Sequence, residues 1–461
     1  MNLILLSLAV IVILYFTINP SKKWKVAFNM ATVSIAALIV LLLLKVIDIE
    51  TIISGIIGTN GIEPWKVLVI FFSVAYVSVS TDVTGIFDYI AYRLVRLANG
   101  DGIKLFLFFY CFAGFLSIFT SNDIVILTLT PIIFYLGKHA KINIIPLLFA
   151  EFFAANTLSM LLYIDNPTNI IMVNALGIGF VEYLSVMWLP TLVAAIVNYI
   201  LLYLIFRKQI TKKYNLNENS EFTVRNKLDA TISSTLMIAM FIFLVLSDSM
   251  EFSIWKITSI FAMLFIIEDI LFSLYYQRKS RQLSAPQLDK REVVLGIPKE
   301  KNEFWLAIKR VPWKILPFVT VFFILVYHLS HIGVIESISE WLSAGSNSLL
   351  SSIGLNGVVA FISANIINNQ PMAILYSYVF TNAKLTLQGI ELRGAVYAVI
   401  IASNLAANFT IIGALAGLMW KKILKDKGVQ ISYFDFIKKG IVITPLVFVA
   451  TLATLYVILQ F

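Results

Sequence analysis

The sequence predicts an all-α polytopic membrane protein with two inverted repeats, each containing a re-entrant helical hairpin and an unwound transmembrane helix. Three observations lead to this fold class: an apolar composition, polar residues that interrupt apolar segments, and a motif that returns in the second half. Of the 461 residues, 59% are hydrophobic and 13% are charged, and the mean hydropathy is +0.89. Soluble domains are about half apolar and a quarter charged, so we expect this chain in a lipid bilayer.

The net charge of +9 and the single cysteine exclude several other classes of protein. Basic residues gather between apolar segments, where they orient membrane helices, so nucleic acid is not an expected partner. One cysteine allows neither an intrachain disulfide nor a multi-thiolate metal site. The sequence contains no nucleophile–base pattern and no metal-ligand pattern. We therefore expect neither an enzyme nor a resident cofactor or metal.

Ten apolar segments are candidate membrane spans, since a helix needs about 20 apolar residues to cross a bilayer. They are 3–18, 27–47, 65–82, 142–163, 184–206, 231–249, 252–275, 314–333, 392–412 and 440–460. Two further stretches, 105–136 and 348–380, are apolar but broken by polar residues, so each is predicted to be a re-entrant hairpin. Mixed segments are predicted to form amphipathic interfacial helices at 83–99, 334–346 and 428–439.

The predicted organisation follows the distribution of charge. Residues 1–25 hold an N-terminal transmembrane helix, 26–206 repeat one, 207–230 a cytoplasmic linker, and 231–461 repeat two with a cytoplasmic loop at 276–310. Lys and Arg concentrate after the first span and in the linker and loop, which places these segments in the cytoplasm and the N-terminus outside. The first hairpin then enters from the cytoplasm and the second from outside.

An internal repeat supports the two halves. Pro64-Trp65-Lys66 returns as Pro312-Trp313-Lys314, 248 residues later, and Asn368 follows Asn122 by 246 residues. Each motif is followed by an apolar span, an amphipathic segment and a broken hairpin. Because the charge argument gives the two copies opposite directions, the sequence predicts the inverted architecture of secondary transporters, with a substrate site near the membrane midplane.

Four polar breaks are the candidate site. The hairpin breaks hold Ser121-Asn122-Asp123 and Asn368-Asn369. The other two follow apolar helices, one at 165–169 around Pro167 and one at 404–413. Polar groups inside a membrane are costly and are usually functional, although asparagines at hairpin tips can also serve only as helix caps. The candidate solute- or ion-binding residues are Ser121, Asn122, Asp123, Asn166, Thr168, Asn169, Asn368, Asn369, Asn408, Thr410 and Gly413.

Three acidic residues are candidates for proton coupling. Asp123 comes first, because an intramembrane carboxyl group can carry a proton or hold a cation. Asp165 could do the same or face a water-filled cavity, and Glu151 is either a second titrating group or a residue at the lipid interface. Two more acidic residues, Glu268 and Asp269, lie near a predicted cytoplasmic helix end, where we expect them to be solvated.

At the four breaks the chain resembles the ion transporter superfamily that includes arsenite permeases, NhaD-type sodium/proton antiporters, citrate and dicarboxylate transporters, and the melanosomal P protein. The stretch SNDIVILTLTPII resembles the arsenite-permease hairpin, and the NPTN of residues 166–169 resembles that family's first unwound helix. The NNQP of residues 368–371 resembles its second hairpin tip, and NLAANFTIIGALAGLMWKKIL its second unwound helix. The resemblance covers nearly the whole chain after about residue 25 and implies a homodimer.

The resemblance implies efflux of arsenite or antimonite in exchange for protons. The alternatives are a Na⁺(Li⁺)/H⁺ antiporter, a citrate, dicarboxylate or other anion transporter, and a receptor that keeps the fold without transport. The last break reads Thr410-Ile411-Ile412-Gly413-Ala414 where the family has Thr-Pro-Ile-Gly-Ser, so the proline and the serine hydroxyl are missing. The Ser-Asn-Thr tips of the dicarboxylate branch are also absent, and an aspartate at the tip disfavours an anionic substrate. The coupling ion is expected to be H⁺ or Na⁺.

Overall fold

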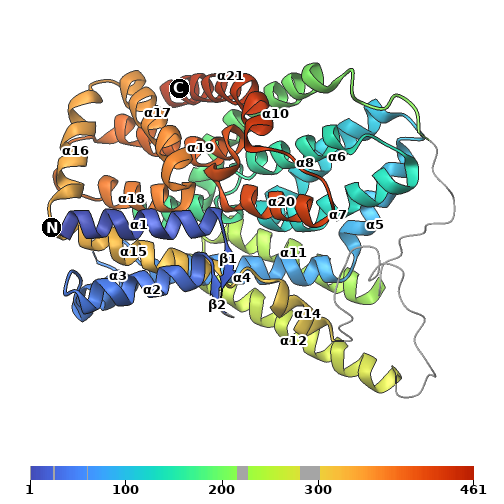
Figure 1. The fold of residues 1–461 in the computed structure, drawn as a ribbon, viewed down its shortest axis with the longest axis horizontal. Helices are drawn as coiled ribbons and strands as arrows, with labels where there is room; N and C mark the ends of the chain where they lie inside the picture. Colours follow the sequence, from blue (N-terminus) through green and yellow to red (C-terminus); the bar gives the residue numbers. More distant parts are fainter. Residues whose placement is uncertain (1, 24–25, 60, 215–226, 281–301) are drawn as a thin grey trace.

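The protein, described by a computed structural model over residues 2–23, 26–59, 61–214, 227–280 and 302–461, is almost entirely helical (Figure 1). Within those ranges, nine helical segments are long and apolar enough to cross a membrane. Shorter apolar helices accompany them at Asn2–Ile18, Met30–Leu43 and Ile144–Leu158. The prediction of an all-α polytopic membrane protein is confirmed. The predicted linker 207–230 and loop 276–310 lie partly outside the described residues.

The elements follow one another in an order that occurs twice. The chain begins with α1 (Asn2–Ile18), β1 (Ser21–Lys23), β2 (Val26–Phe28), α2 (Met30–Leu43) and α3 (Ile49–Ile57). The first series is α4 (Pro64–Val83), α5 (Ile86–Leu97), α6 (Gly102–Phe119), α7 (Asn122–Ala140), α8 (Ile144–Leu158), the 3₁₀ turn η1 (Tyr163–Asp165), α9 (Pro167–Leu176) and α10 (Phe180–Phe206).

Among the residues that the structure describes, three helices separate this series from its counterpart, namely α11 (Lys227–Leu246), α12 (Ile254–Ser280) and α14 (Glu303–Arg310). The second series is α15 (Ile315–His331), α16 (Val334–Gly345), α17 (Leu349–Ile367), α18 (Asn369–Phe380), α19 (Gly389–Phe409), the 3₁₀ turn η2 (Ile411–Gly413), α20 (Leu415–Asp426) and α21 (Tyr433–Gln460). Each element of the first series thus has a counterpart of the same type, in the same order, in the second.

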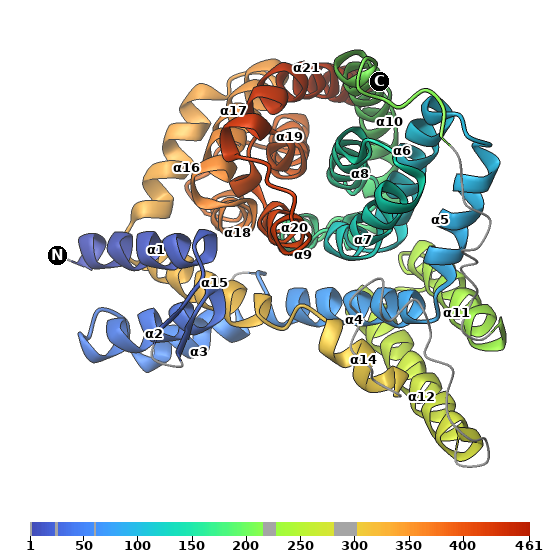
Figure 2. The ribbon, with the colours of Figure 1, turned by 45° about the vertical axis from the view of Figure 1, so that its right-hand side comes forward.

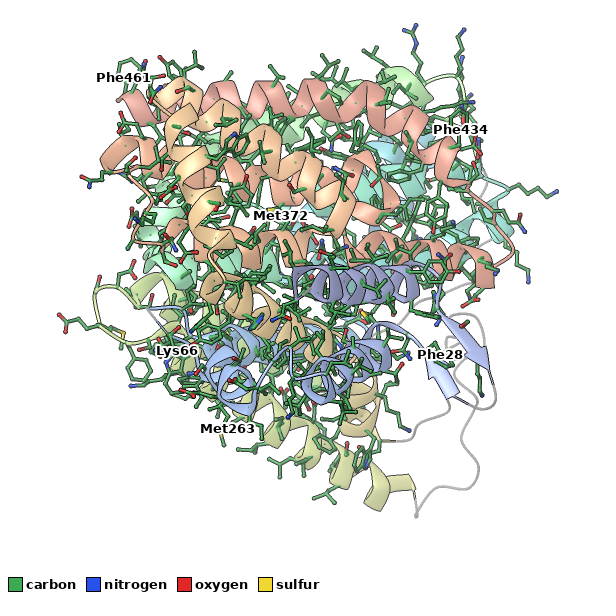
Figure 3. The ribbon with its side chains drawn as sticks, turned by 60° about the vertical axis from the view of Figure 1, so that its left-hand side comes forward. Phe28, Lys66, Met263, Met372, Phe434 and Phe461 are labelled. Carbon is green, nitrogen blue, oxygen red and sulfur yellow. The ribbon has the colours of Figure 1, made fainter. Side chains whose placement is uncertain are left out.

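The helices form two layers (Figure 2). One layer, which we call the scaffold layer, contains α1–α4, α11, α12, α14 and α15; α4 packs against α12 and α14, and α15 packs against α2 and α3. The other, the core layer, contains α6–α10 and α17–α21. Figure 3 shows α21 running along the outer side of the core layer from Phe434 to Phe461, with Met372 of α18 inside and Lys66 at the start of α4. The short helices α5 and α16 connect the layers.

The two series pack against each other in a reciprocal way. Helix α7 of the first contacts α20 of the second, while α18 of the second contacts α9 of the first. The helices α8 and α19 also touch, and α10 packs against α21. The segments that follow the polar breaks of one half therefore lie beside the hairpin of the other half, which gathers all four breaks in the core layer.

Each polar motif ends a helix, as predicted. The break between α6 and α7 falls at Thr120 and Ser121, and the break between α17 and α18 falls at Asn368. Pro167 opens α9, where its missing N–H is not needed. In both stretches two helices therefore meet at the predicted polar residues, while their re-entrant course in the membrane stays a prediction.

The second unwound helix breaks without a proline. The Thr410 hydroxyl accepts the Gly413 N–H at 3.2 Å, and the chain then folds back closely on α19. A Cβ atom at Gly413 would lie 2.5 Å from the Ala406 carbonyl oxygen, and one at Gly417 would lie 2.2 Å from the Ile411 carbonyl oxygen. Close backbone approach at two glycines thus produces the bend that the proline produces elsewhere.

Several boundaries differ from the predictions. The predicted span 27–47 ends at Leu43, because a turn follows and Asp48 then caps α3 by accepting the Thr51 N–H at 2.7 Å. No separate helix forms at 428–439; Ser432 caps α21, which continues without interruption to Gln460. The hairpin β1–β2 and the helix α14 were not predicted.

The expectation that Glu268 and Asp269 are solvated is wrong. They are 7% and 4% exposed, because α4, α11 and α14 pack around this part of α12. Sequence reasoning placed them near a helix end without knowing that three other helices cover that end.

We predict that Gly417→Ala destabilises the protein by on the order of 1–3 kcal/mol, because the added methyl group overpacks the backbone at the second break. Thermal unfolding of the purified protein in detergent measures this as a lower melting temperature. Gly354→Ala in α17 is the matched control, since no atom lies within 4 Å of its Cβ position. Equal melting temperatures for the two variants would contradict the close-approach explanation.

Candidate functional site

Two asparagines at equivalent positions occupy the centre of the core layer. Asn156 of α8 precedes Asn404 of α19 by 248 residues, the spacing of the two Pro-Trp-Lys motifs. The Asn156 amide donates to the Phe152 carbonyl oxygen at 2.9 Å, and the Asn404 amide donates to the Ile400 carbonyl oxygen at 2.8 Å. This bond to the preceding turn fixes each amide on its own helix and leaves its oxygen for partners on other elements.

Asn404 joins the second half to the first break. Its Oδ1 accepts hydrogen bonds from Ser159 Oγ at 3.0 Å and from Asn166 Nδ2 at 2.9 Å. Its Nδ2 donates to Asn169 Oδ1 at 2.7 Å. One side chain of α19 therefore binds both asparagines of the Asn-Pro-Thr-Asn motif, and all four residues are buried.

Asn156 makes the corresponding connection from the first half. Its Oδ1 accepts from Asn122 Nδ2 at the first hairpin tip at 2.9 Å. Its Nδ2 donates to Asn408 Oδ1 at the end of α19 at 3.2 Å. Asn408 in turn donates to Thr157 Oγ1 at 3.0 Å. The first hairpin tip is thus tied to the second unwound helix.

The second hairpin tip joins through Ser403. The hydroxyl groups of Thr168 and Ser403 lie 3.0 Å apart, and Asn369 Nδ2 donates to the Ser403 carbonyl oxygen at 3.1 Å. Ser159, which also donates to the Asn156 carbonyl oxygen at 3.0 Å, connects the two asparagine centres. We call this set the polar network; its members are Asn122, Asn156, Thr157, Ser159, Asn166, Thr168, Asn169, Asn369, Ser403, Asn404 and Asn408.

Several predicted residues lie outside the polar network. Ser121 caps α7 by accepting the Ile124 N–H at 3.4 Å. Thr410 donates to Asn365 Oδ1 at 2.6 Å and shapes η2 together with Gly413. These three predicted residues organise the local chain at the breaks rather than joining the two halves.

Asn368 has a strained backbone. Its φ is +75°, which costs a non-glycine residue on the order of 1–3 kcal/mol. Its side chain offsets this by donating to the Ile412 carbonyl oxygen at 3.0 Å and accepting the Gln370 N–H at 3.3 Å. Strain of this kind is concentrated at functional sites, and here it sets the hairpin tip beside η2.

The three candidate carboxyl groups are buried in different surroundings. Asp123 lies in the first turn of α7 and is 3% exposed. Glu151 is fully buried, and its Oε1 accepts from Thr130 Oγ1 at 2.8 Å, so it lies between α7 and α8 rather than facing lipid. Asp165, in η1, is 1% exposed, and neither of its carboxyl oxygens has a hydrogen-bond partner among the described residues.

The sequence reasoning missed the residues that complete the polar network. Asn156, Thr157, Ser159 and Ser403 were not candidates, because three of them lie in helices next to the breaks and Ser159 caps the end of α8. Asn404 belongs to the last polar break but was not among the predicted binding residues. One signal could have found Asn156: it lies one repeat spacing before Asn404, so the repeat pairs two asparagines inside apolar helices.

A cleft of about 400 Å³ lies between the layers at the start of α4. Its lining includes Tyr163 of η1, Asn174 of α9 and the turn between α11 and α12, and none of the residues that line it belongs to the polar network. The polar network itself offers amide and hydroxyl groups, which both donate and accept hydrogen bonds, and contains no Lys or Arg. Groups of this kind suit an uncharged polar solute, while the carboxyl groups beside them could hold a proton or a cation.

Comparison with known proteins agrees with this architecture. A family model described as "Citrate transporter" (CitMHS) matches residues 11–396. The "Arsenical pump membrane protein" of Escherichia coli K12 is 28% identical over 407 residues, which cover 86% of this chain and 87% of the relative. The "Putative arsenical pump membrane protein" of Bacillus subtilis is 26% identical over 415 residues, 87% of this chain and 89% of the relative. The match spans most of the chain, and the chain therefore belongs to the CitMHS family of membrane transporters, within the superfamily that the four breaks resembled.

Proposed function

We propose that the protein is a secondary active transporter that exports arsenite or antimonite in exchange for protons. The polar network carries this proposal: eleven buried amide- and hydroxyl-bearing residues join both unwound helices and both hairpin tips into one centre. The bacterial relatives are named arsenical pump membrane proteins, which supports the same solute.

The chemistry of the centre favours a neutral solute. Arsenous acid is uncharged at neutral pH and carries hydroxyl groups, which donate to amide oxygens and accept from amide N–H groups. A citrate trianion would need cationic partners on leaving water, and the polar network holds none. Because the family is described as citrate transporters, the transport assay below also includes citrate.

Asp123 is the first candidate for the coupling proton. The free N–H groups at the start of α7 can stabilise its charged form, while burial allows its neutral form, so both states are accessible during a transport cycle. The observation that favours the Na⁺/H⁺ alternative is Asp165, whose two buried oxygens have no hydrogen-bond partner among the described residues. Such oxygens are suited to a cation or to a retained proton.

In this proposal, the substrate site opens alternately to the two sides of the membrane because the two layers move relative to each other. The two series are inverted repeats with re-entrant hairpins, the N-terminus is outside, and the large basic loops are cytoplasmic. The core layer moves against the scaffold layer, and in this proposal the movement extends the cleft beside η1 toward the polar network. The transporter acts in the bacterial plasma membrane as a homodimer, as the superfamily resemblance implies.

We expect everted membrane vesicles that contain the protein to accumulate arsenite when their lumen is acidic, because the exported solute enters the lumen as protons leave. Radioactive arsenite and a luminal pH-sensitive dye measure the two fluxes together. Parallel arms with Na⁺, Li⁺ and citrate test the alternatives. If arsenite neither accumulates nor changes the dye signal, the solute assignment fails; a dye response to Na⁺ alone supports the antiporter.

Asp123→Asn is expected to abolish the arsenite-driven proton signal, because an amide cannot bind and release the proton. The dye response should fall to that of vesicles without the protein. Asp426→Asn, at an exposed position at the end of α20, is the matched control and should behave like the wild type. If Asp123→Asn couples protons like the wild type, Asp123 does not carry the coupling proton, and Asp165 and Glu151 become the candidates.

A further inference from the structure

A group of lysine side chains gathers where the last two helices of the core layer meet. Lys421 Nζ of α20 lies over the Tyr433 ring of α21, 3.0 Å from its centroid. A second contact joins the rings of Trp420 and Phe436, whose centroids are 5.9 Å apart. The lysines around this junction, which are exposed or half-buried, form what we call the basic surface; its members are Lys421, Lys422, Lys425, Lys427, Lys438 and Lys439.

Acidic side chains do not balance the charge of the basic surface. Residues 421–439 contain six lysines and two acidic residues, Asp426 and Asp435. The Asp435 carboxyl group accepts the Ser432 hydroxyl at 2.6 Å. Among the residues that the structure describes, no member of the basic surface forms an ion pair. Like charges on neighbouring turns repel one another, so a bound anion would stabilise this surface.

The basic surface lies where a membrane helix meets the lipid headgroups. Helix α21 is long and apolar enough to cross a membrane, and Phe434 in its first turn is 66% exposed. Lys438 Nζ lies over the Phe434 ring, 4.5 Å from its centroid. Figure 3 shows Phe434 at one end of α21, on the outer side of the core layer. Exposed aromatic rings and lysines at the end of a membrane helix are typical of the headgroup region.

Beyond Phe434, α21 exposes a row of apolar side chains along its outer side. They are about half exposed or more, and they are Ile441, Val442, Leu446 and Val449. The spacing of these residues follows the turns of the helix, so they continue from Phe434 along one side. The basic surface therefore stands directly beside an apolar path that leads into the bilayer.

We propose that the basic surface binds the headgroup of an anionic phospholipid. The phosphate lies among the lysines, and the acyl chains lie along the apolar row of α21. Charge complementarity selects an anion, and the adjoining apolar row selects one that carries acyl chains. Clusters of about four to eight basic residues beside a membrane helix attract anionic lipids in this way. The proposal is independent of the transported solute and the coupling ion, since no member of the polar network belongs to the basic surface.

The position of this lipid gives it an effect on the second unwound helix. Helix α20 begins directly after η2. A Cβ atom at Gly440 of α21 would lie 2.4 Å from the Phe409 carbonyl oxygen at the end of α19, so the start of α21 packs tightly against the second break. A lipid that bridges α20 and α21 therefore stabilises the chain on both sides of this break.

The test compares thermal unfolding of the full-length protein in detergent with added phosphatidylglycerol or phosphatidylcholine, which differ in headgroup charge. Phosphatidylglycerol should raise the melting temperature of the wild type by several degrees over phosphatidylcholine, because a ligand that binds only the folded state stabilises it. Lys425→Gln/Lys438→Gln should lose most of this difference, since each lysine beside an anionic lipid contributes about a factor of five in affinity. A general loss of stability cancels, because each protein is compared with itself in the two lipids.

The matched control is Lys256→Gln/Lys384→Gln, which removes two exposed lysines outside the basic surface. Lys256 also lies over an aromatic ring, that of Phe252, at 5.5 Å. Native mass spectrometry counts the bound phosphatidylglycerol, which the wild type and the control should retain and Lys425→Gln/Lys438→Gln should lose. Equal lipid effects in the two double variants would overturn the proposal. Equal stabilisation by glycerol 3-phosphate would also overturn it, because the surface would then bind a free phosphate.

Discussion

The arrangement of the core layer depends on one requirement: polar groups at four interrupted helices must be hydrogen-bonded although they are buried inside the protein. A helix that stops inside apolar surroundings leaves N–H and C=O groups without partners, and each costs about 1–3 kcal/mol if it stays unpaired. Side chains at the breaks pair several of these backbone groups: Asn166 Oδ1 accepts the Thr168 N–H, and Asn169 Nδ2 donates to the Ser159 carbonyl oxygen. The asparagines at 156 and 404 hold such side chains in place, because each binds its own helix and reaches into the opposite half. The halves consequently cannot be packed independently, and the reciprocal contacts of α7 with α20 and of α18 with α9 follow.

The same groups that stabilise the breaks are those that could bind a solute. Amide and hydroxyl groups that hydrogen-bond to one another can exchange these hydrogen bonds for hydrogen bonds to a small hydroxylated molecule, with little loss of free energy. The halves share a backbone plan but differ in chemistry, because Glu151 and Asp165 of the first series correspond to Val399 and Gly413 of the second. Carboxyl groups beside the polar network therefore come only from the first series, as the hairpin-tip Asp123 also does. A symmetric fold thus carries an asymmetric set of titratable groups, which is suited to coupling one ion to one solute.

The sequence predicted the fold class and the places where helices break, because both depend on local signals: long apolar runs, a proline at 167 and polar residues inside apolar stretches. It did not predict which side chains meet. Ser403 and Thr157 lie inside helices, where periodicity cannot distinguish a packed polar residue from a binding residue. The burial of Glu268 depends on helices from three other parts of the chain, so no local pattern could reveal it. A small residue at 417 indicates that a close approach is possible, but only the folded chain shows that it meets the Ile411 carbonyl oxygen.

The central claim is that both unwound helices build one solute site through the polar network, and a double-mutant cycle tests it most directly. Arsenite transport would be measured for Asn166→Ala, Asn404→Ala and the double variant, because these side chains bond to each other at 2.9 Å across the two halves. Asn356→Ala is the control, since this buried asparagine also bonds the carbonyl four residues back but contacts only its own half. The account predicts that the double variant loses little more than either single variant, with a coupling energy of about 0.5–3 kcal/mol. Additive losses at 166 and 404 would contradict a single shared site.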